Sequence, residues 1–188
     1  DVLVVGSGAA GLATALHLSP HARVIVLSKD DIRGGSTNRA QGGVATVSQP
    51  ADSVDAHVHD TVVAGAGLCN EKIVRYVVNR ARQAIDHIED LGLEFDQQDN
   101  GPHLTREGGH THRRVLHVAD TTGHAIATTL INRVLSDVKI RILTKRVAID
   151  VVTTGKPTPN DSQTMGAYVF NAETGNVEVI EARYVVLA

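Results

Sequence analysis

Apolar residues along this chain fall into short Val-rich runs separated by longer stretches with helical spacing. The first run, Val2–Val5, leads into a Gly-x-Gly-x-x-Gly turn at residues 6–11, and apolar residues then recur at helical intervals. A second apolar run follows at Arg23–Leu27. Short β-branched runs are typical of buried parallel strands, whereas a 3.6-residue period indicates a helix. The pattern therefore predicts a βαβ unit over residues 1–29.

Helical periodicity dominates residues 52–92. We expect Asp52 or Ser53 to cap a first helix, and Asn70 to cap a longer one that Gly92 terminates, because these residue types favour helix ends. The first helix carries two histidines that we expect at the surface, His57 and His59. The longer helix is interpreted as scaffold from its apolar positions: Ile73, Val74, Val77, Val78, Ala81, Ala84, Ile85, Ile88 and Leu91.

Residues 122–188 return to strands. A helix from Ala125 to about Ser136 precedes a third parallel strand at Lys139–Leu143, and alternating runs then predict a three-stranded meander and a return strand at Tyr184–Leu187. Four residues of the helix are expected to point inward: Ile126, Leu130, Val134 and Leu135. Three Gly-containing turns are predicted, the second of them long and mobile: Asn100–Pro102, Gly155–Ser162 and Thr174–Asn176.

These elements together predict an α/β protein. The expected architecture is Rossmann-like, with a parallel sheet, crossover helices and an inserted β-meander. The chain opens directly on a strand and ends on an apolar run that nothing covers. Because buried strands need covering elements, we expect an incomplete fragment of the domain.

Composition narrows the classes of function. The 188 residues carry a net charge of −3 and 3% aromatic residues, so a basic field or a stacking surface for nucleic acid is not expected. No apolar run reaches the roughly 20 residues of a membrane span. The single cysteine, Cys69, cannot form an internal disulfide, which fits a reducing cytoplasm. We therefore expect a cytoplasmic protein with neither nucleic-acid nor membrane partners.

The glycine turn has the chemistry of a phosphate site. Gly6 permits the tight turn, Gly8 lets a pyrophosphate approach the backbone, and Gly11 lets the helix pack on the strand. The helix N-terminus adds N–H donors and the positive end of a dipole. An ordinary Gly-rich turn between strand and helix is the alternative.

The segment after the second strand argues against a nicotinamide site. Ser28 and Lys29 stand where such sites place the acidic residue that binds ribose hydroxyls. Lys29 is then either a cofactor contact or a solvated loop lysine. The following loop, residues 33–43, has two Gly pairs and small polar side chains, which suit close approach to a flat cofactor. A flexible loop is the alternative.

Residues 103–117 hold the densest group of ionisable side chains. A Gly pair in their midst indicates a functional loop or hairpin. Anion binding by its arginines is the favoured interpretation, because guanidinium groups pair with carboxylates: Arg106, Arg113 and Arg114. The histidines lack zinc-ligand spacing, so no metal site is expected. A hydrated basic loop is the alternative.

Three motifs of this chain together resemble those of a known superfamily. Gly6–Leu12, Ser36-Thr37 with Ala40–Gly43, and Asp120-x-Thr122-Gly123-His124 resemble the succinate dehydrogenase/fumarate reductase flavoprotein superfamily. The segment Leu104–Arg114 is similar to the aspartate oxidase branch. The resemblance spans essentially the whole chain. It implies an FAD-binding fold and oxidation of L-aspartate to iminoaspartate, with oxygen or fumarate as the electron acceptor and a link to quinolinate synthesis.

The resemblance also implies site residues. It assigns the pyrophosphate to Gly6, Ser7, Gly8, Ala9, Ala10 and Gly11, the adenosine end to Lys29, Val147 and Ala148, and the flavin to Ser36, Thr37, Asn38, Arg39, Ala40, Gln41, Gly42 and Gly43. Ser36 stands where covalent relatives carry a flavin-linking histidine, so FAD is expected to bind noncovalently. Other substrate-binding residues of the family lie beyond Ala188, and this stretch alone is expected to be inactive.

Glu107 is the expected substrate-orienting residue. Aspartate differs from succinate by an ammonium group, which a site made only of Arg and His would repel and a carboxylate would receive. A salt bridge from Glu107 to Arg106 or Arg113 is the alternative. Two rival functions stay open: a fumarate reductase or succinate dehydrogenase flavoprotein, and a non-catalytic nucleotide-binding module.

Overall fold

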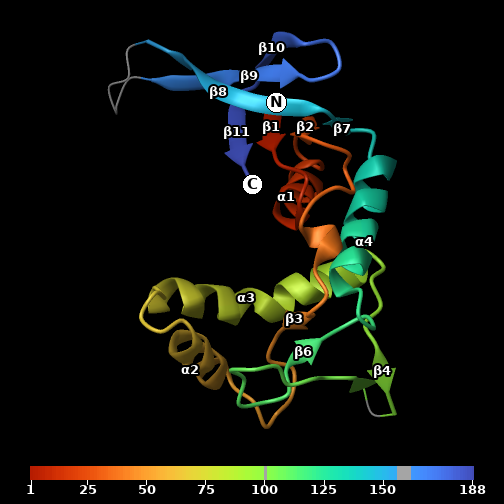
Figure 1. The fold of residues 1–188 in the computed structure, drawn as a ribbon, viewed down its shortest axis with the longest axis vertical. Helices are drawn as coiled ribbons and strands as arrows, with labels where there is room; N and C mark the ends of the chain where they lie inside the picture. Colours follow the sequence, from red (N-terminus) through yellow and green to blue (C-terminus); the bar gives the residue numbers. More distant parts are fainter. Residues whose placement is uncertain (100, 156–161) are drawn as a thin grey trace. The chain divides into compact units, whose positions relative to one another are not determined.

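The computed structural model describes residues 1–99, 101–155 and 162–188. The chain divides into two compact units: residues 1–38 with 127–188 form unit 1, and residues 39–126 form unit 2 (Figure 1). Each unit is described by itself. The predicted turn at Asn100 and most of the connection predicted at Gly155–Ser162 lie outside the described residues.

Unit 1 is built on a parallel sheet of four strands. These are β1 (Val2–Val5), β2 (Val24–Leu27), β7 (Ile140–Leu143) and β11 (Tyr184–Leu187), in the order β11-β1-β2-β7. The registers place Val2 opposite both Val24 and Tyr184, so the first strand lies inside the sheet. Helix α1 (Ala9–Leu18) joins β1 to β2, which confirms the βαβ unit. The third parallel strand and the return strand are confirmed as well.

A three-stranded antiparallel meander completes unit 1. Strands β8 (Arg146–Thr154), β9 (Gln163–Asn171) and β10 (Asn176–Glu181) are ordered β10-β9-β8. The meander packs on the parallel sheet through a buried cluster formed by Leu3 and Leu27 with Ala167 and Val169. The alternating pattern therefore predicted the inserted meander correctly, because one face of β9 is buried and the other exposed.

Unit 2 is mainly helical. Its long elements are α2 (Val54–Ala64) and α3 (Glu71–Asp90), and its strands are short: β3 (Val44–Ala45), β4 (Gln97–Gln98), β5 (Gly101–Pro102) and β6 (Val115–Leu116). The Ser53 hydroxyl accepts a hydrogen bond from the Ala56 N–H, and the Asn70 amide oxygen caps α3. A 3₁₀ turn, Thr37–Arg39, precedes unit 2, and α4 (Thr122–Ser136) follows its last strand. The predicted starts of both long helices are confirmed.

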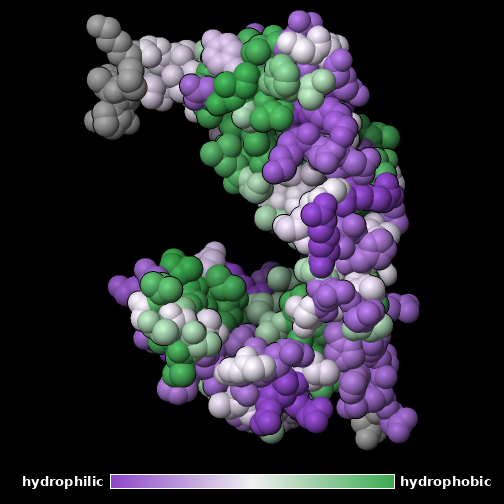
Figure 2. Space-filling view, viewed as in Figure 1, coloured by the Kyte–Doolittle hydropathy of each residue, from purple (hydrophilic) through white to green (hydrophobic). Residues whose placement is uncertain are grey.

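Some apolar side chains do not lie where the pattern put them. Leu135 is 60% exposed beside the fully buried Val134, because neighbouring residues on a helix point about 100° apart. The expectation that both face inward is wrong. Apolar side chains also gather at the exposed surface of α2 and α3 (Figure 2): Val63, Leu68, Ile73, Tyr76 and Val77. Within the described ranges, every helix is too short or too polar to cross a bilayer.

Candidate functional site

The glycine turn of unit 1 is shaped by backbone approach. Gly6 has a φ of +118°, and a Cβ there would lie 2.0 Å from the Ala188 carbonyl oxygen. A Cβ at Gly11 would lie 2.0 Å from the Gly6 carbonyl oxygen, so the helix start packs directly on the turn. At Gly8, by contrast, a Cβ would meet only the Thr37 hydroxyl, at 3.6 Å. Gly6 and Gly11 are required by the fold, whereas Gly8 leaves room on the ligand side of the turn.

Side-chain hydroxyls surround this turn. Gly8 is the N-cap of α1 and contributes no side-chain cap, and the Ala9 N–H donates to the Thr37 hydroxyl over 3.1 Å. The Ser7 hydroxyl donates to the buried Ser28 hydroxyl over 2.7 Å. Residues from three separate segments of unit 1 thus meet at the N-terminus of α1, where an anion is stabilised by backbone donors and the helix dipole.

The remaining predicted cofactor residues lie in both units. Lys29 is exposed at the end of β2. Val147 and Ala148 follow Arg146, whose N–H donates to the Ser28 carbonyl, so they start near the same end of β2. Ser36 is exposed and Asn38 is half-buried in unit 1, and the loop continues in unit 2 through four exposed residues: Arg39, Ala40, Gln41 and Gly42.

Within unit 2, the loop is tied to later elements by its backbone. The Gly123 N–H at the start of α4 donates to the Ala40 carbonyl over 2.9 Å. Gly43 has a φ of +91°, and a Cβ there would lie 2.6 Å from the Leu116 carbonyl oxygen. The loop is therefore anchored at residues 40 and 43 while its side chains stay exposed.

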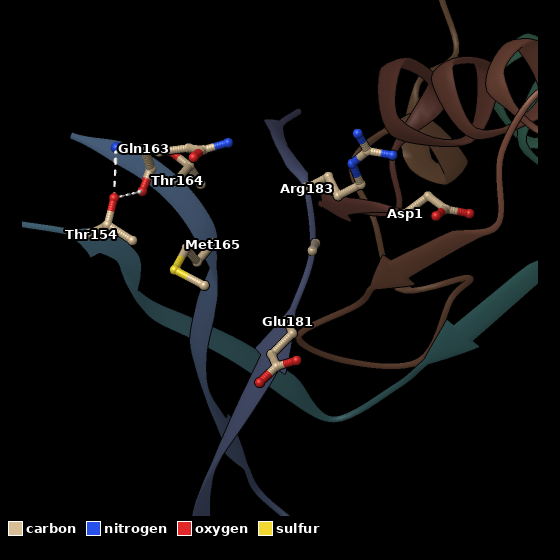
Figure 3. A pocket seen from close by; sticks show the side chains of 8 residues that line it. Asp1, Thr154, Gln163, Thr164, Met165, Glu181 and Arg183 are labelled. Atoms are coloured by element: carbon tan, nitrogen blue, oxygen red, sulfur yellow. Dashed lines mark hydrogen bonds between the residues drawn. The ribbon is translucent and has the colours of Figure 1, made fainter. Parts of the chain in front are cut away.

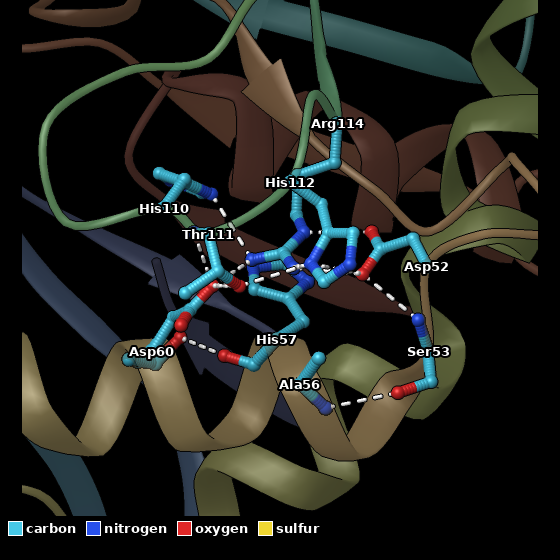
Figure 4. Close-up of polar contacts among 10 residues, drawn as sticks. Asp52, Ser53, Ala56, His57, Asp60, His110, Thr111, His112 and Arg114 are labelled. Atoms are coloured by element: carbon cyan, nitrogen blue, oxygen red, sulfur yellow. Dashed lines mark hydrogen bonds and ion pairs between the residues drawn. The ribbon is translucent and has the colours of Figure 1, made fainter.

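The most deeply buried ionic group of unit 2 centres on Arg114 (Figure 4). The Arg114 side chain is 0% exposed, and its Nε and Nη2 donate to the two carboxylate oxygens of Asp52, each over 2.7 Å. Its Nη1 donates to Asp60 Oδ2 over 2.6 Å. The two carboxylates are 2% and 5% exposed. We call Asp52, Asp60 and Arg114 the Arg114 clamp.

The clamp corrects two expectations. Arg114 was expected to bind an external anion, but the carboxylates of Asp52 and Asp60 occupy its donors. His57 was expected at the surface, yet it is 8% exposed and its ring lies 5.7 Å from that of His110, between centroids. Burial beneath the 103–117 loop, which the helical pattern could not register, explains the position of His57.

Ionisation in the clamp follows from burial and pairing. Burial alone would raise the pKa of Asp60, but hydrogen bonds from Thr111 and Arg114 outweigh it and hold that pKa well below 3.8. The pKa of Asp52 is also lowered, because the Arg114 bonds overcome burial. Burial, reinforced by the Arg114 charge, lowers the pKa of His57. At neutral pH the clamp therefore holds two carboxylates and one guanidinium, and the neighbouring His57 is neutral.

Glu107 lies at the exposed tip of the same loop. Its carboxylate accepts a hydrogen bond from the Thr105 hydroxyl at 3.4 Å. Arg113 donates to the Leu104 carbonyl over 3.3 Å, and in the described part of the chain Glu107 forms no ion pair with Arg106 or Arg113. The geometry thus gives no support to the salt-bridge alternative and leaves this carboxylate facing solvent.

A second polar group of unit 2 involves histidines. His117 Nδ1 lies 3.1 Å from Asp96 Oδ2, and the His103 ring contacts the His117 ring edge-on. Among residues 1–99, 101–155 and 162–188, no three His, Cys, Asp or Glu side chains are arranged to hold a metal ion.

A cavity of about 390 Å³ lies elsewhere in unit 1 (Figure 3). Its walls include Asp1 and Arg183, which precede β1 and β11, together with the ends of β8 and β9. Ligands of parallel α/β sheets bind at the carboxyl ends of the strands, and this cavity adjoins the amino ends. We assign it no role.

Comparison with known proteins decides the family. A family model described as an FAD binding domain matches residues 1–188, the whole chain. This chain belongs to the FAD-binding-domain family. Its cofactor is FAD, and the helix start, where Gly8 has no side chain and leaves open space, fits the cofactor's pyrophosphate.

Similar proteins are longer than this FAD-binding domain. It is 48% identical over 196 residues to L-aspartate oxidase of Pseudomonas aeruginosa and 44% identical over 194 residues to that of Vibrio cholerae. Both matches cover 100% of this chain and 36% of the relative. A solved structure of Escherichia coli quinol fumarate reductase FrdA superposes with a TM-score of 0.89 at 30% identity, covering 100% of this chain and 32% of that one. The chain thus spans about a third of the proteins it matches.

Proposed function

We propose that the full-length protein carrying this domain oxidises L-aspartate to iminoaspartate, with oxygen or fumarate as the terminal electron acceptor. The identity of 48% to an L-aspartate oxidase over the whole chain supports the proposal. The observation that carries it is the exposed Glu107 carboxylate, which forms no ion pair among the described residues and lies on a loop that also presents Arg106 and Arg113. This combination suits a substrate with two carboxylates and one ammonium.

The residues of this chain have distinct tasks in that reaction. Bound FAD supplies the acceptor for the hydride that leaves the substrate Cα. The N-terminus of α1 binds the pyrophosphate, and residues 36–43 line the flavin. Glu107 receives the substrate ammonium and so orients the Cα–H bond. In this proposal Lys29, Val147 and Ala148 contact the adenosine end.

Cofactor attachment forms a second part of the proposal. Ser36 offers a hydroxyl where an attached flavin would need an imidazole nitrogen, so FAD binds noncovalently. Acid precipitation of the full-length holoenzyme is expected to release all flavin into the supernatant. Flavin retained in the protein pellet would contradict noncovalent binding and would leave the family assignment intact.

The product has a chemical consequence. Iminoaspartate hydrolyses in water, so an enzyme that condenses it must take it up promptly, and we propose functional coupling to quinolinate synthase in the cytoplasm. The free thiol of Cys69 supports a reducing compartment. Quinolinate formation by the two enzymes mixed in one solution would be compared with its formation when a dialysis membrane separates them. Slower formation in the separated arrangement would support the coupling.

Fumarate reduction is the second candidate function, favoured by the fumarate reductase structure at a TM-score of 0.89. Aspartate-dependent flavin reduction by the wild-type enzyme separates the two functions, and Glu107→Gln, which keeps shape and removes charge, tests whether Glu107 recognises the aspartate ammonium. Loss of a charge-assisted bond costs about 1.5–3 kcal/mol, so kcat/KM for aspartate is expected to fall roughly 10- to 150-fold. Fumarate has no ammonium, and its reduction is expected to be unchanged or faster. Parallel losses on both substrates would show that Glu107 is scaffold.

A further inference from the structure

The loop between Thr105 and Val115 is closed at its base by backbone hydrogen bonds. The Thr105 N–H donates to the Val115 carbonyl over 3.0 Å, and the Val115 N–H donates back over 3.1 Å. The Arg114 N–H also donates to the Thr105 carbonyl. This base fixes where the loop leaves the fold, but it sets no direction for the residues at the tip.

A second anchor holds the returning half of the loop. Asp60 Oδ2 accepts from the Thr111 N–H and from the Thr111 hydroxyl, each over 2.8 Å, as well as from Arg114 Nη1. Asp60 belongs to α2, whose N-terminus is capped by Ser53. The loop is therefore fastened to a helix at residue 111 as well as at its base.

Glu107 is coupled to this anchor through one turn. The His110 N–H donates to the Glu107 carbonyl over 3.1 Å, so residues 107–110 form a closed turn. Thr111 follows directly on that turn and is fixed to Asp60. Movement of the Thr111 anchor must therefore rotate the turn that carries the Glu107 carboxylate.

We propose that Asp60, supported by Asp52 and Arg114, is a positioning residue that aims the Glu107 carboxylate at the substrate ammonium. This inference rests on the proposed function. The clamp touches no substrate; it acts through Thr111 and the 107–110 turn. Burial of all three charged side chains gives the anchor one geometry, because a buried charge cannot exchange its partner for water.

The test uses the full-length holoenzyme and the variants Asp60→Asn, Glu107→Gln and their double mutant. Asp55→Asn is the matched control, because it removes one carboxylate from the same helix at an exposed ion pair with Arg75. We expect Asp60→Asn to lower kcat/KM for aspartate about 10-fold or more and to change fumarate reduction less than about 3-fold. Asp55→Asn is expected to leave both activities unchanged.

The double mutant gives the decisive measurement. If the clamp acts through Glu107, Asp60→Asn is expected to lower aspartate kcat/KM less than about 3-fold once Glu107 is already Gln, because coupled residues are not additive. Fully additive losses, or equal losses on aspartate and fumarate, would overturn the inference. Thr111→Val, which removes one of the three bonds to Asp60, serves if Asp60→Asn does not fold, with the same pattern expected at smaller amplitude.

Trypsin cleavage after Arg106 supplies a readout independent of aspartate. Loss of the anchor is expected to speed this cleavage about 10-fold relative to Asp55→Asn, since local opening exposes the loop to the protease. Unchanged cleavage would overturn the anchoring of the turn. A wild-type enzyme that does not oxidise aspartate, but whose Asp60→Asn variant is cleaved faster, would refute the proposed function and keep the anchor.

Discussion

Helices α1 and α2 begin in opposite ways. The first turn of α1 starts at Gly8, which has no side chain to cap it, and it follows a glycine turn with open space. Helix α2 starts at Ser53, whose hydroxyl accepts the Ala56 N–H over 3.1 Å. Helix α2 is capped by the side chain of its own N-cap residue, whereas the N-cap residue of α1 has no side chain and the Ala9 N–H is met by the hydroxyl of Thr37 from a later segment.

The same contrast holds for charged donors. The five N–H groups of a guanidinium suit carboxylates, and in unit 2 those of Arg114 are directed to Asp52 and Asp60. In unit 1 we propose that backbone donors of a glycine turn meet the anion of the cofactor. A cluster of arginines in a sequence is therefore weak evidence of an anion site, because carboxylates of the same chain can take up the arginine donors.

The largest effect is expected from breaking the open helix start. Gly8→Val would place a side chain where the proposed site puts the phosphate oxygens, and we expect the full-length enzyme to lose FAD on gel filtration while keeping its helical circular dichroism. Gly11→Val is the contrasting variant: its Cβ would collide with the Gly6 carbonyl, and we expect it not to fold. A yellow Gly8→Val holoenzyme would refute the pyrophosphate placement.

The second-largest effect is expected from removing the cation of the clamp. It is expected to lower the free energy of unfolding more than any change at the surface does. Arg114→Leu leaves Asp52 and Asp60 buried without a counter-ion, and we expect the free energy of unfolding to fall by about 3–5 kcal/mol. Arg106→Leu, at an exposed position in the same loop, is expected to change it by less than about 0.5 kcal/mol. Urea unfolding measures the free energy of unfolding of both variants. Equal values for the two would contradict a stabilising role of the clamp.

Acidification is expected to lower the stability of the fold in two steps, one from His57 and one from the clamp carboxylates. His57 has a lowered pKa in the folded state, so the unfolded chain binds a proton at this residue more readily. The contribution of neutral His57 to the free energy of unfolding is therefore complete above about pH 6.5 and is lost as the pH falls below it. Asp52 and Asp60 also have lowered pKa values, so their contribution is present above about pH 4 and is lost on further acidification. His57→Gln is expected to remove only the upper step in stability measured against pH. An unchanged profile would contradict the neutral His57.

The smallest effect is expected at the capped helix start. Ser53→Ala removes the hydroxyl that accepts the Ala56 N–H and is expected to lower the free energy of unfolding by about 1 kcal/mol. FAD content is expected to stay unchanged, which separates this cap from the helix start at Gly8. Flavin loss in this variant would contradict the assignment of a purely structural role to the helix start at Ser53.

Local patterns predicted most of the fold because its elements are locally specified. Val-rich runs are strands β1, β2 and β11, the period of 3.6 predicted α3, and Asn70 and Gly92 delimit it. The side of a helix that faces the core is set by tertiary packing, which is why Leu135 was misplaced. Leu135 lies about 100° around the helix from Val134, at the edge of the apolar stripe, and packing decides on which side of that edge it falls.

The same local patterns could not predict which side chains of the 103–117 loop are buried. Arg113 and Arg114 are adjacent and chemically identical, yet one is exposed and the other fully buried. The difference is made by carboxylates 54 and 62 residues earlier in the chain. Pairings at that separation leave no periodic signal. The sequence therefore predicted a charged loop without showing which of its charged side chains form ion pairs within the protein.

The pairing of β1 with β11 has a consequence for the order in which the chain is completed. Strand β1 is synthesised first, but its neighbour on one side, Tyr184–Leu187, emerges more than 180 residues later. Unit 2 is one continuous stretch, 39–126, and has all its own residues long before then. During translation, unit 2 is expected to reach a protease-resistant state while one edge of β1 is still unpaired. Ribosome-bound chains stalled once residue 126, or once residue 187, has left the ribosome would show the difference. Until Tyr184–Leu187 emerges, β1 presents an unpaired sheet edge, and such an edge is a template for aggregation.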